Sequence, residues 1–145
     1  MSPDPTAPCL FCRIARGEAP SAFVLQTKQV AAFLDHRPLF PGHCLVIPRP
    51  HVATLADLPD RLTRPLWNAV RALARAVEEA LGAEGSFVAV NNRVSQSMPH
   101  LHVHVVPRRR GDGLRGFFWP RGHYRDPGEM EDVRRRIAAA VAGSD

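Results

Sequence analysis

Apolar residues recur along the chain with two periods, and each period predicts a type of element. Between positions 62 and 81 they recur at steps of three and four, the spacing of an amphipathic helix. We expect this helix over about 63–81, with Thr63 as its N-terminal cap, Pro65 tolerated in the first turn and Gly82 at its end. Short apolar runs between turn residues predict strands at 22–26, 30–34, 43–47, 86–90 and 100–106. Pro107 is expected to end the last strand.

Two further helices are predicted near the ends of the chain. Leu10, Phe11 and Ile14 fit one face of a short helical turn that Gly17 and Pro20 would end. A final helix is expected over about 127–141, because acidic residues gather near its start and arginines follow. This order of strands and helices favours an α+β fold, with a mainly antiparallel five-stranded sheet, one long central helix and a C-terminal helix.

Length and composition favour one domain. The chain has 145 residues, 45% of them hydrophobic, which suffices for a core. We expect a flexible, proline-rich tail at 1–8 and a single domain over 9–145. No apolar stretch approaches the roughly 20 residues of a membrane span, and the N-terminus lacks the pattern of a secretion signal. These features predict a cytoplasmic protein with no membrane partner.

Charge adds a preference for anionic partners. The formal net charge is +5 and the isoelectric point is about 10.0, which suits a nucleotide, a nucleic acid or a lipid surface. Seven arginines lie between positions 93 and 125 against one acidic residue, Asp112. Lys28 is the only lysine of the chain, so genome composition explains this excess as well as phosphate binding does.

Three histidines alternate with apolar residues in the segment 100–106. In a strand, His100, His102 and His104 would share one face, about 6.6 Å apart along the chain, while the intervening apolar residues face the core. Neighbouring imidazoles repel one another when charged, so such a row points to metal binding, proton handling or nucleophilic attack. The alternative is a solvated polar face.

Several motifs in one order resemble the histidine triad (HIT) family. They cover positions 9 to about 107: Cys-Leu-Phe-Cys at 9–12, Ala-Phe-Leu-Asp at 32–35, Pro-Gly-His-Cys-Leu-Val-Ile-Pro at 41–48, His51, Gln96-Ser97 and the alternating histidines. The resemblance implies a HIT-like fold and a nucleotide-binding hydrolase or transferase. Such enzymes act at an α-phosphate through a nucleotidyl-histidine intermediate.

The resemblance also assigns roles to side chains. His102 matches the nucleophile, and a neutral imidazole can attack near pH 7 when its other nitrogen donates to a fixed acceptor. His104 and His43 match residues that orient and stabilise the phosphate, and Ser97 matches a residue that contacts the phosphate or the leaving group. Asp35 would accept hydrogen bonds from the ribose hydroxyls.

The remaining nucleotide contacts are less sharply assigned. The residues that would bind the nucleotide, beside Asp35, Ser97, His102 and His104, are Leu10, Phe11, Ile14, Phe33, Asn91 and Gln96. The four apolar members could equally belong to the core. The loop before the triad departs from the family pattern, because it is shorter and has Ser95 where glycine is expected, so Asn91 and Asn92 both remain candidates for the phosphate contact.

A second cluster predicts a metal site. Cys9 and Cys12 have the spacing of half a tetrahedral zinc site, and the resemblance adds His51 and His100, as in zinc-bearing bacterial-type members. The zinc would be structural, and no catalytic metal is required. A redox role for the cysteine pair is the alternative, but no thioredoxin-like pattern accompanies it. Cys44 lies on an apolar strand and is expected to be a small buried side chain.

The segment 108–121 mixes arginines with Phe117, Phe118 and Trp119. Its arginines either hold distal phosphates, over this active site or that of a dimer partner, or form a solvated loop. We expect the aromatic residues to pack on the sheet or at a dimer interface.

These observations leave three functional hypotheses. The first is a homodimeric enzyme that cleaves AMP-linked or GMP-linked substrates, such as dinucleoside polyphosphates or nucleoside phosphoramidates. The second is a non-catalytic nucleotide-sensing module with a structural zinc. The third is a nucleic-acid binder, which is the weakest because no recognition motif is present.

Overall fold

The computed structural model describes residues 9–114 and 121–143. The chain divides into two compact units, Met1–Asp112 and Gly113–Asp145, which are described separately here. The expected tail at 1–8 lies outside the described residues, and a single domain over 9–145 stays a prediction.

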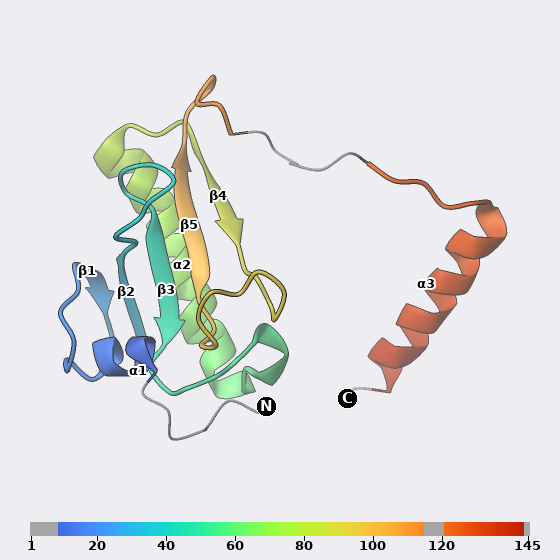
Figure 1. Ribbon diagram of the computed structural model, residues 1–145, viewed down its shortest axis with the longest axis horizontal. Coiled ribbons are helices and arrows are strands. Elements are labelled where there is room, and N and C mark those ends of the chain that lie inside the picture. The colour runs from blue at the N-terminus through green and yellow to red at the C-terminus, as the bar shows by residue number, and fades with distance from the viewer. Residues whose placement is uncertain (1–8, 115–120, 144–145) are drawn as a thin grey trace. The chain divides into compact units, whose positions relative to one another are not determined.

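The first unit is built on one antiparallel sheet (Figure 1). Its strands lie side by side in the order β1-β2-β3-β5-β4 and every neighbouring pair is antiparallel. Their bounds are β1 Phe23–Gln26, β2 Val30–Leu34, β3 Cys44–Pro48, β4 Gly85–Ala89 and β5 Val103–Arg108. The prediction of an α+β fold with a five-stranded antiparallel sheet is confirmed.

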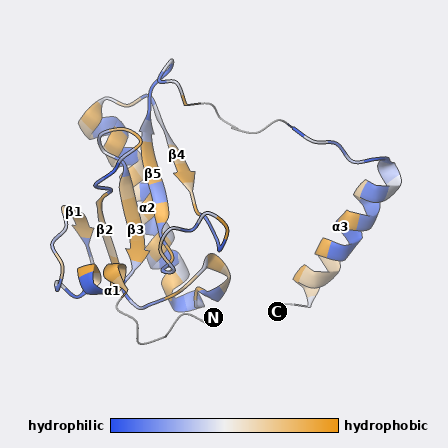
Figure 2. Ribbon diagram, viewed as in Figure 1, coloured by the Kyte–Doolittle hydropathy of each residue, from blue (hydrophilic) through white to orange (hydrophobic). Residues whose placement is uncertain are grey.

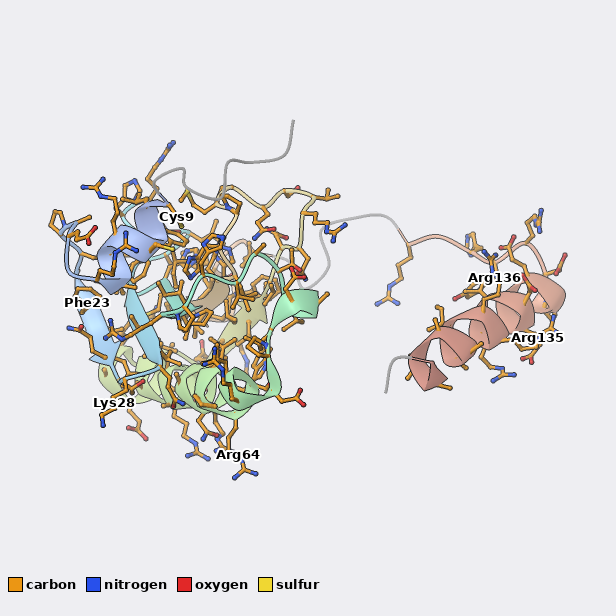
Figure 3. The ribbon with its side chains drawn as sticks, turned by 90° about the horizontal axis from the view of Figure 1, so that it is seen from below. Cys9, Phe23, Lys28, Arg64, Arg135 and Arg136 are labelled. Carbon is orange, nitrogen blue, oxygen red and sulfur yellow. The ribbon has the colours of Figure 1, made fainter. Side chains whose placement is uncertain are left out.

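Helix α2, Asp60–Leu81, covers one face of the sheet (Figures 1 and 3). Its buried residues are Leu62, Leu66, Ala69, Val70, Leu73 and Val77, as the spacing predicted. Arg64 is exposed on the side of the helix that faces away from the sheet. Gly82 ends the helix in the left-handed conformation at φ 66°, with its N–H donated to the carbonyl of Glu78.

The predicted start of this helix was wrong. It begins at Asp60, after Pro59, and Thr63 lies within the helix instead of capping it. The Thr63 hydroxyl donates to the carbonyl of Pro59 at 3.4 Å. The extra turn brings the fully buried Leu62 into the core, which outweighs the absence of a side-chain cap.

The opposite face of the sheet packs against the short helix α1, Leu10–Ala15 (Figures 1 and 3). Phe11 and Ile14 of α1 join a second buried cluster with Phe33, Leu45 and other strand residues. Figure 2 colours β2, β3 and β5 as largely hydrophobic. Since successive residues of a strand point to opposite faces, strands covered on both sides must be apolar throughout.

The triad segment is only partly a strand, which corrects two expectations. β5 begins at Val103, so His100 and His102 precede it, and Pro107 lies inside it. The Arg108 carbonyl faces β4 and accepts from the N–H of Glu84, so the nitrogen of Pro107 points to the other side of β5. β3 pairs with β5 only as far as Val105, so no ladder bond is lost there.

The remaining elements are a 3-10 turn, Leu55–Asp57, and helix α3, Pro127–Ala142, in the second unit. The start of α3 is capped by Asp126, whose Oδ1 accepts from the N–H of Glu129 at 2.8 Å. The prediction of a C-terminal helix is confirmed. Among the described residues, no helix combines the length and apolarity that a membrane crossing requires.

Replacing Gly42 with alanine is expected to destabilise the protein more than replacing Gly17. Both glycines have positive φ, 101° and 76°, so a side chain strains either backbone by about 1–2 kcal/mol. A Cβ on Gly42 would also overlap Leu81 and press on Pro107, whereas one on Gly17 meets nothing within 4 Å. Urea unfolding of Gly42→Ala and Gly17→Ala measures both costs. Equal losses would contradict the packing argument.

Candidate active site

A cavity of about 740 Å³ lies on the α1 side of the sheet. The predicted site residues that line it are Leu10, Phe11, Ile14, Phe33, Asp35, Ser97, His102 and His104. His43 lies directly behind His104 and does not line the cavity. The fold therefore brings residues from α1, β2, β5 and the loop before the triad to one place.

His102 is held in one orientation by the backbone. The residue is 3% exposed, and its Nδ1 lies 2.8 Å from the carbonyl oxygen of His100. A carbonyl only accepts, so the Nδ1–H of His102 donates and Nε2 keeps its lone pair. The ring of Phe11 meets that of His102 edge-on, with the centroids 5.2 Å apart. In an imidazole held this way, Nε2 is the nitrogen whose lone pair can react.

His43 and His104 form a buried pair beside His102. Nε2 of His43 lies 2.9 Å from Nδ1 of His104 and 3.8 Å from Oδ2 of Asp35. The pKa of His104 is lowered to about 4, mainly by burial and less by the neighbouring His102 and His43, while Asp35 opposes the shift. Burial also lowers the pKa of His43, again against Asp35. Both rings are therefore neutral near pH 7.

Apolar side chains form one wall of the cavity. Phe11 and Phe33 are 6% and 3% exposed, and their rings meet edge-on at 5.4 Å. Leu10 is 41% exposed, so its side chain belongs to the rim of the cavity. Phe11, Ile14 and Phe33 belong to the core and also line the cavity. The interpretation of these residues as core and their interpretation as cavity lining are therefore compatible.

Sequence reasoning missed several lining residues. They are Pro20, Ser21, Ala22, Leu34, His36, Arg37, Leu45 and Met98. Arg37 stands out because its N–H donates to Oδ1 of Asp35 at 2.9 Å, which fixes that carboxylate. Its position two residues after Asp35 was the available signal.

The loop before the triad is held by Gln96. Its amide donates to the carbonyl of Ala53 at 2.7 Å and accepts from the N–H of Arg93 at 2.8 Å. Ser95 has φ 60°, in the left-handed region that favours glycine, which explains why the family pattern has glycine there.

Neither asparagine of this loop lines the cavity. Oδ1 of Asn92 accepts from the N–H of Leu55 at 2.8 Å, while Asn91 is exposed. Gln96 also lies outside the lining. The nucleotide contacts of Asn91 and Gln96 stay predictions.

Cys9, Cys12, His51 and His100 come together as predicted, with one potential ligand atom of each within 4.8 Å of the others. Nδ1 of His100 lies 3.4 Å from both sulfurs, and Nδ1 of His51 lies 3.3 Å from Sγ of Cys12. Tetrahedral zinc would separate sulfur and nitrogen ligands by about 3.6 Å, so the four residues fit this ion.

The surroundings of the cluster also suit a cation. Nε2 of the fully buried His100 donates to the carbonyl of Pro48 at 2.8 Å, which leaves Nδ1 free to face the sulfurs. Burial raises the pKa of the Cys12 thiol to about 11, with a further contribution from Cys9. A bound cation would hold the Cys12 sulfur as a thiolate near pH 7. Cys44 is 3% exposed in the core, as expected.

The first arginines of the basic segment are engaged away from the cavity. Arg108 forms two hydrogen bonds with Asp112, at 2.6 and 3.0 Å, and Arg109 bonds the carbonyl of Leu81. Arg110 lies 3.9 Å from Glu84. Phe117, Phe118 and Trp119 lie outside the described residues.

Acid is expected to destabilise the protein partly through His104. Its pKa is about 4 in the folded chain against about 6.5 when unfolded, so the unfolded chain takes up the proton first as the pH falls. The contribution of neutral His104 to the free energy of unfolding is fully present above about pH 6.5. It declines as the pH falls towards about 4, by at most about 1.4 kcal/mol per pH unit. Urea unfolding measures the free energy of unfolding of the parent and of His104→Gln at each pH. The difference between the two free energies should narrow as the pH falls, and a difference that stays constant would contradict this linkage.

Comparison with known proteins identifies the family. Residues 16–111 match the HIT domain. The chain is 36% identical over 141 residues to Protein hit of Bacillus subtilis, covering 94% of this chain and 96% of that protein. It is 33% identical over 143 residues to adenosine 5′-monophosphoramidase of Saccharomyces cerevisiae, covering 96% and 86%.

A solved structure gives the same result. The crystal structure of a Zn-bound histidine triad family protein from Mycobacterium smegmatis has a TM-score of 0.69 and 34% sequence identity, covering 94% of this chain and 97% of that one. The HIT domain match spans the sheet, α2 and the alternating histidines. The chain therefore belongs to the HIT domain family.

Proposed function

We propose that this protein is a nucleotide-binding hydrolase or transferase that cleaves at an α-phosphate. The observation that supports this most is the hydrogen bond from Nδ1 of His102 to the carbonyl of His100, at 2.8 Å. Because that bond occupies one nitrogen as a donor, the lone pair of Nε2 is available to attack phosphorus.

The reaction has two displacements. In the first, Nε2 of His102 forms a bond to the α-phosphorus while the bond to the leaving group breaks. The leaving group takes the electron pair, and an amine leaving group also takes up a proton from solvent, so that it departs as the neutral amine. In the second, water or another acceptor attacks the phosphorus of the nucleotidyl-histidine, and the N–P bond breaks. His102 then returns to its neutral form, and the proton of the attacking water passes to solvent.

The cavity suits a nucleoside monophosphate unit. The base would lie against Leu10, Phe11, Ile14 and Phe33, and Asp35 would accept from the ribose hydroxyls. His43, His104 and Ser97 would surround the phosphate, with both histidines neutral. The yeast relative is named an adenosine 5′-monophosphoramidase, which favours AMP-linked or GMP-linked phosphoramidates; dinucleoside polyphosphates are the other candidates.

We also propose a structural zinc at Cys9, Cys12, His51 and His100, as in zinc-bearing bacterial-type members. The Mycobacterium smegmatis neighbour is described as Zn-bound, and the four residues fit the ion here. Bound zinc would supply a cross-link between α1 and the triad segment. His100 would then hold both the metal, through its ring, and the nucleophile, through its carbonyl.

A cytoplasmic homodimer is part of the same proposal. β4 is an edge strand of the sheet, and its Val88 is 38% exposed. A free edge strand with an exposed apolar side chain is a ready surface for pairing with a second copy.

Replacing His102 is expected to abolish turnover. His102→Ala should lower kcat for adenosine 5′-phosphoramidate by about a thousandfold or more, because the nucleophile itself is removed. Rapid quenching of the parent with a slow AMP-linked substrate should trap the nucleotidyl group on His102, detected by peptide mass spectrometry. His123→Ala, at an exposed histidine outside the cavity lining, is the matched control. A fully active His102→Ala enzyme would rule the mechanism out.

Removing a thiolate is expected to release the metal and destabilise the fold. Cys12→Ser should lose most of the zinc that the parent retains, about one per chain, and unfold at a lower temperature. Elemental analysis and thermal unfolding measure both. Cys44→Ala removes a buried thiol outside the cluster and should keep its zinc. Equal zinc in both variants would refute this ligand set.

A further inference from the structure

A hydrogen-bonded chain runs from the main chain to the cavity through two histidines. The N–H of Leu39 lies 3.1 Å from Nδ1 of His43, and Nε2 of His43 lies 2.9 Å from Nδ1 of His104. His104 lines the cavity, while His43 is behind it and only 4% exposed.

The direction of this chain follows from its first member. A backbone N–H can only donate, so Nδ1 of His43 must accept, and neutral His43 carries its proton on Nε2. That Nε2–H then donates to Nδ1 of His104. Oδ2 of Asp35, 3.8 Å from the same Nε2, favours a proton there as well. Neutral His104 must therefore carry its own proton on Nε2.

This tautomer decides which group of His104 faces a substrate. Its Nδ1 is turned to His43, so Nε2 is the nitrogen left for the cavity, beside the ring of His102 at a centroid distance of 5.0 Å. An N–H there donates to a phosphoryl oxygen. The opposite tautomer would turn a lone pair towards the same oxygen and repel it.

A metal bound by Asp35, His43 and His104 is the competing explanation, because their ligand atoms also lie within 4.8 Å of one another. Metal on Nε2 of His43 would move the proton of that ring to Nδ1. There it would face the N–H of Leu39, donor against donor. The backbone contact favours the hydrogen-bonded chain over a metal.

We propose that the main-chain N–H of Leu39 is a positioning group for the reaction: it sets the tautomer of His43 and, through it, makes His104 a neutral hydrogen-bond donor to the phosphate. The part of this inference that concerns phosphate rests on the proposed function. The loop that places Leu39 is fixed at both ends, since the N–H of Asp35 donates to the carbonyl of His43 and the N–H of His43 to that of Phe40. The Leu39 side chain is 55% exposed, so its backbone can be tested separately.

Nitrogen-15 NMR of the histidine rings tests the tautomers in the unaltered protein at neutral pH. Long-range correlations between ring nitrogens and ring protons distinguish a protonated nitrogen from a free one. We expect His43 and His104 both to carry the proton on Nε2. A proton on Nδ1 of either ring, or a metal shift of both on adding zinc in excess of the first cluster, would overturn the proposal. This readout is independent of turnover, so it decides the tautomers even if the proposed activity fails.

Two substitutions at one position test the consequence. Leu39→Pro removes the N–H, whereas Leu39→Ala keeps it and removes the exposed side chain. With adenosine 5′-phosphoramidate as substrate, we expect Leu39→Pro to lower kcat by about 10- to 100-fold with KM changed by less than about threefold. Its His43 and His104 should also lose their single tautomer by NMR. Leu39→Ala should match the parent in both.

Three results would overturn this consequence. They are a folded Leu39→Pro with parental kcat, a folded Leu39→Pro with unchanged tautomers, and a Leu39→Ala variant as impaired as Leu39→Pro. If Leu39→Pro does not fold, the spectrum of the unaltered protein decides.

Discussion

The candidate site depends on one hydrogen bond, from Nδ1 of His102 to the carbonyl of His100, at 2.8 Å. Both residues precede β5, so the ladder of the sheet does not hold that carbonyl. It is held instead by the buried ring of His100, which donates to Pro48, and by the N–H of Leu101, which donates to Val52. The orientation of the His102 ring is therefore decided by the surroundings of His100.

The two faces of the sheet differ in what covers them. On one face α2 buries a continuous apolar stripe against the strands. On the other face α1 is less than two turns long, and it leaves room for the cavity. Phe11 of this helix lies between Cys9 and Cys12 in sequence and contacts the ring of His102, so a metal held by α1 would also steady the wall of the cavity.

Local patterns predicted most of the fold because they report local constraints. Steps of three and four predicted the buried stripe of α2, and short apolar runs between turn residues predicted the strands, each within a few residues. The expectations that failed depend on distant contacts. Thr63 lies inside α2 because an additional turn buries Leu62. Pro107 lies inside β5 because the pairing of β5 with β3 extends only to Val105.

The sequence by itself determined the class of fold, because alternation and short spacings place side chains on known faces, and its motifs, by their resemblance to the HIT family, indicated the family and the residues of both clusters. Only the tertiary structure decided which atoms meet. The N–H of Leu39 reaches Nδ1 of His43 and the amide of Gln96 donates to the carbonyl of Ala53, and no spacing along the chain reports either contact. The reason is physical: a hydrogen bond depends on distance and direction between atoms that folding brings together, and the order of residues along the chain specifies neither.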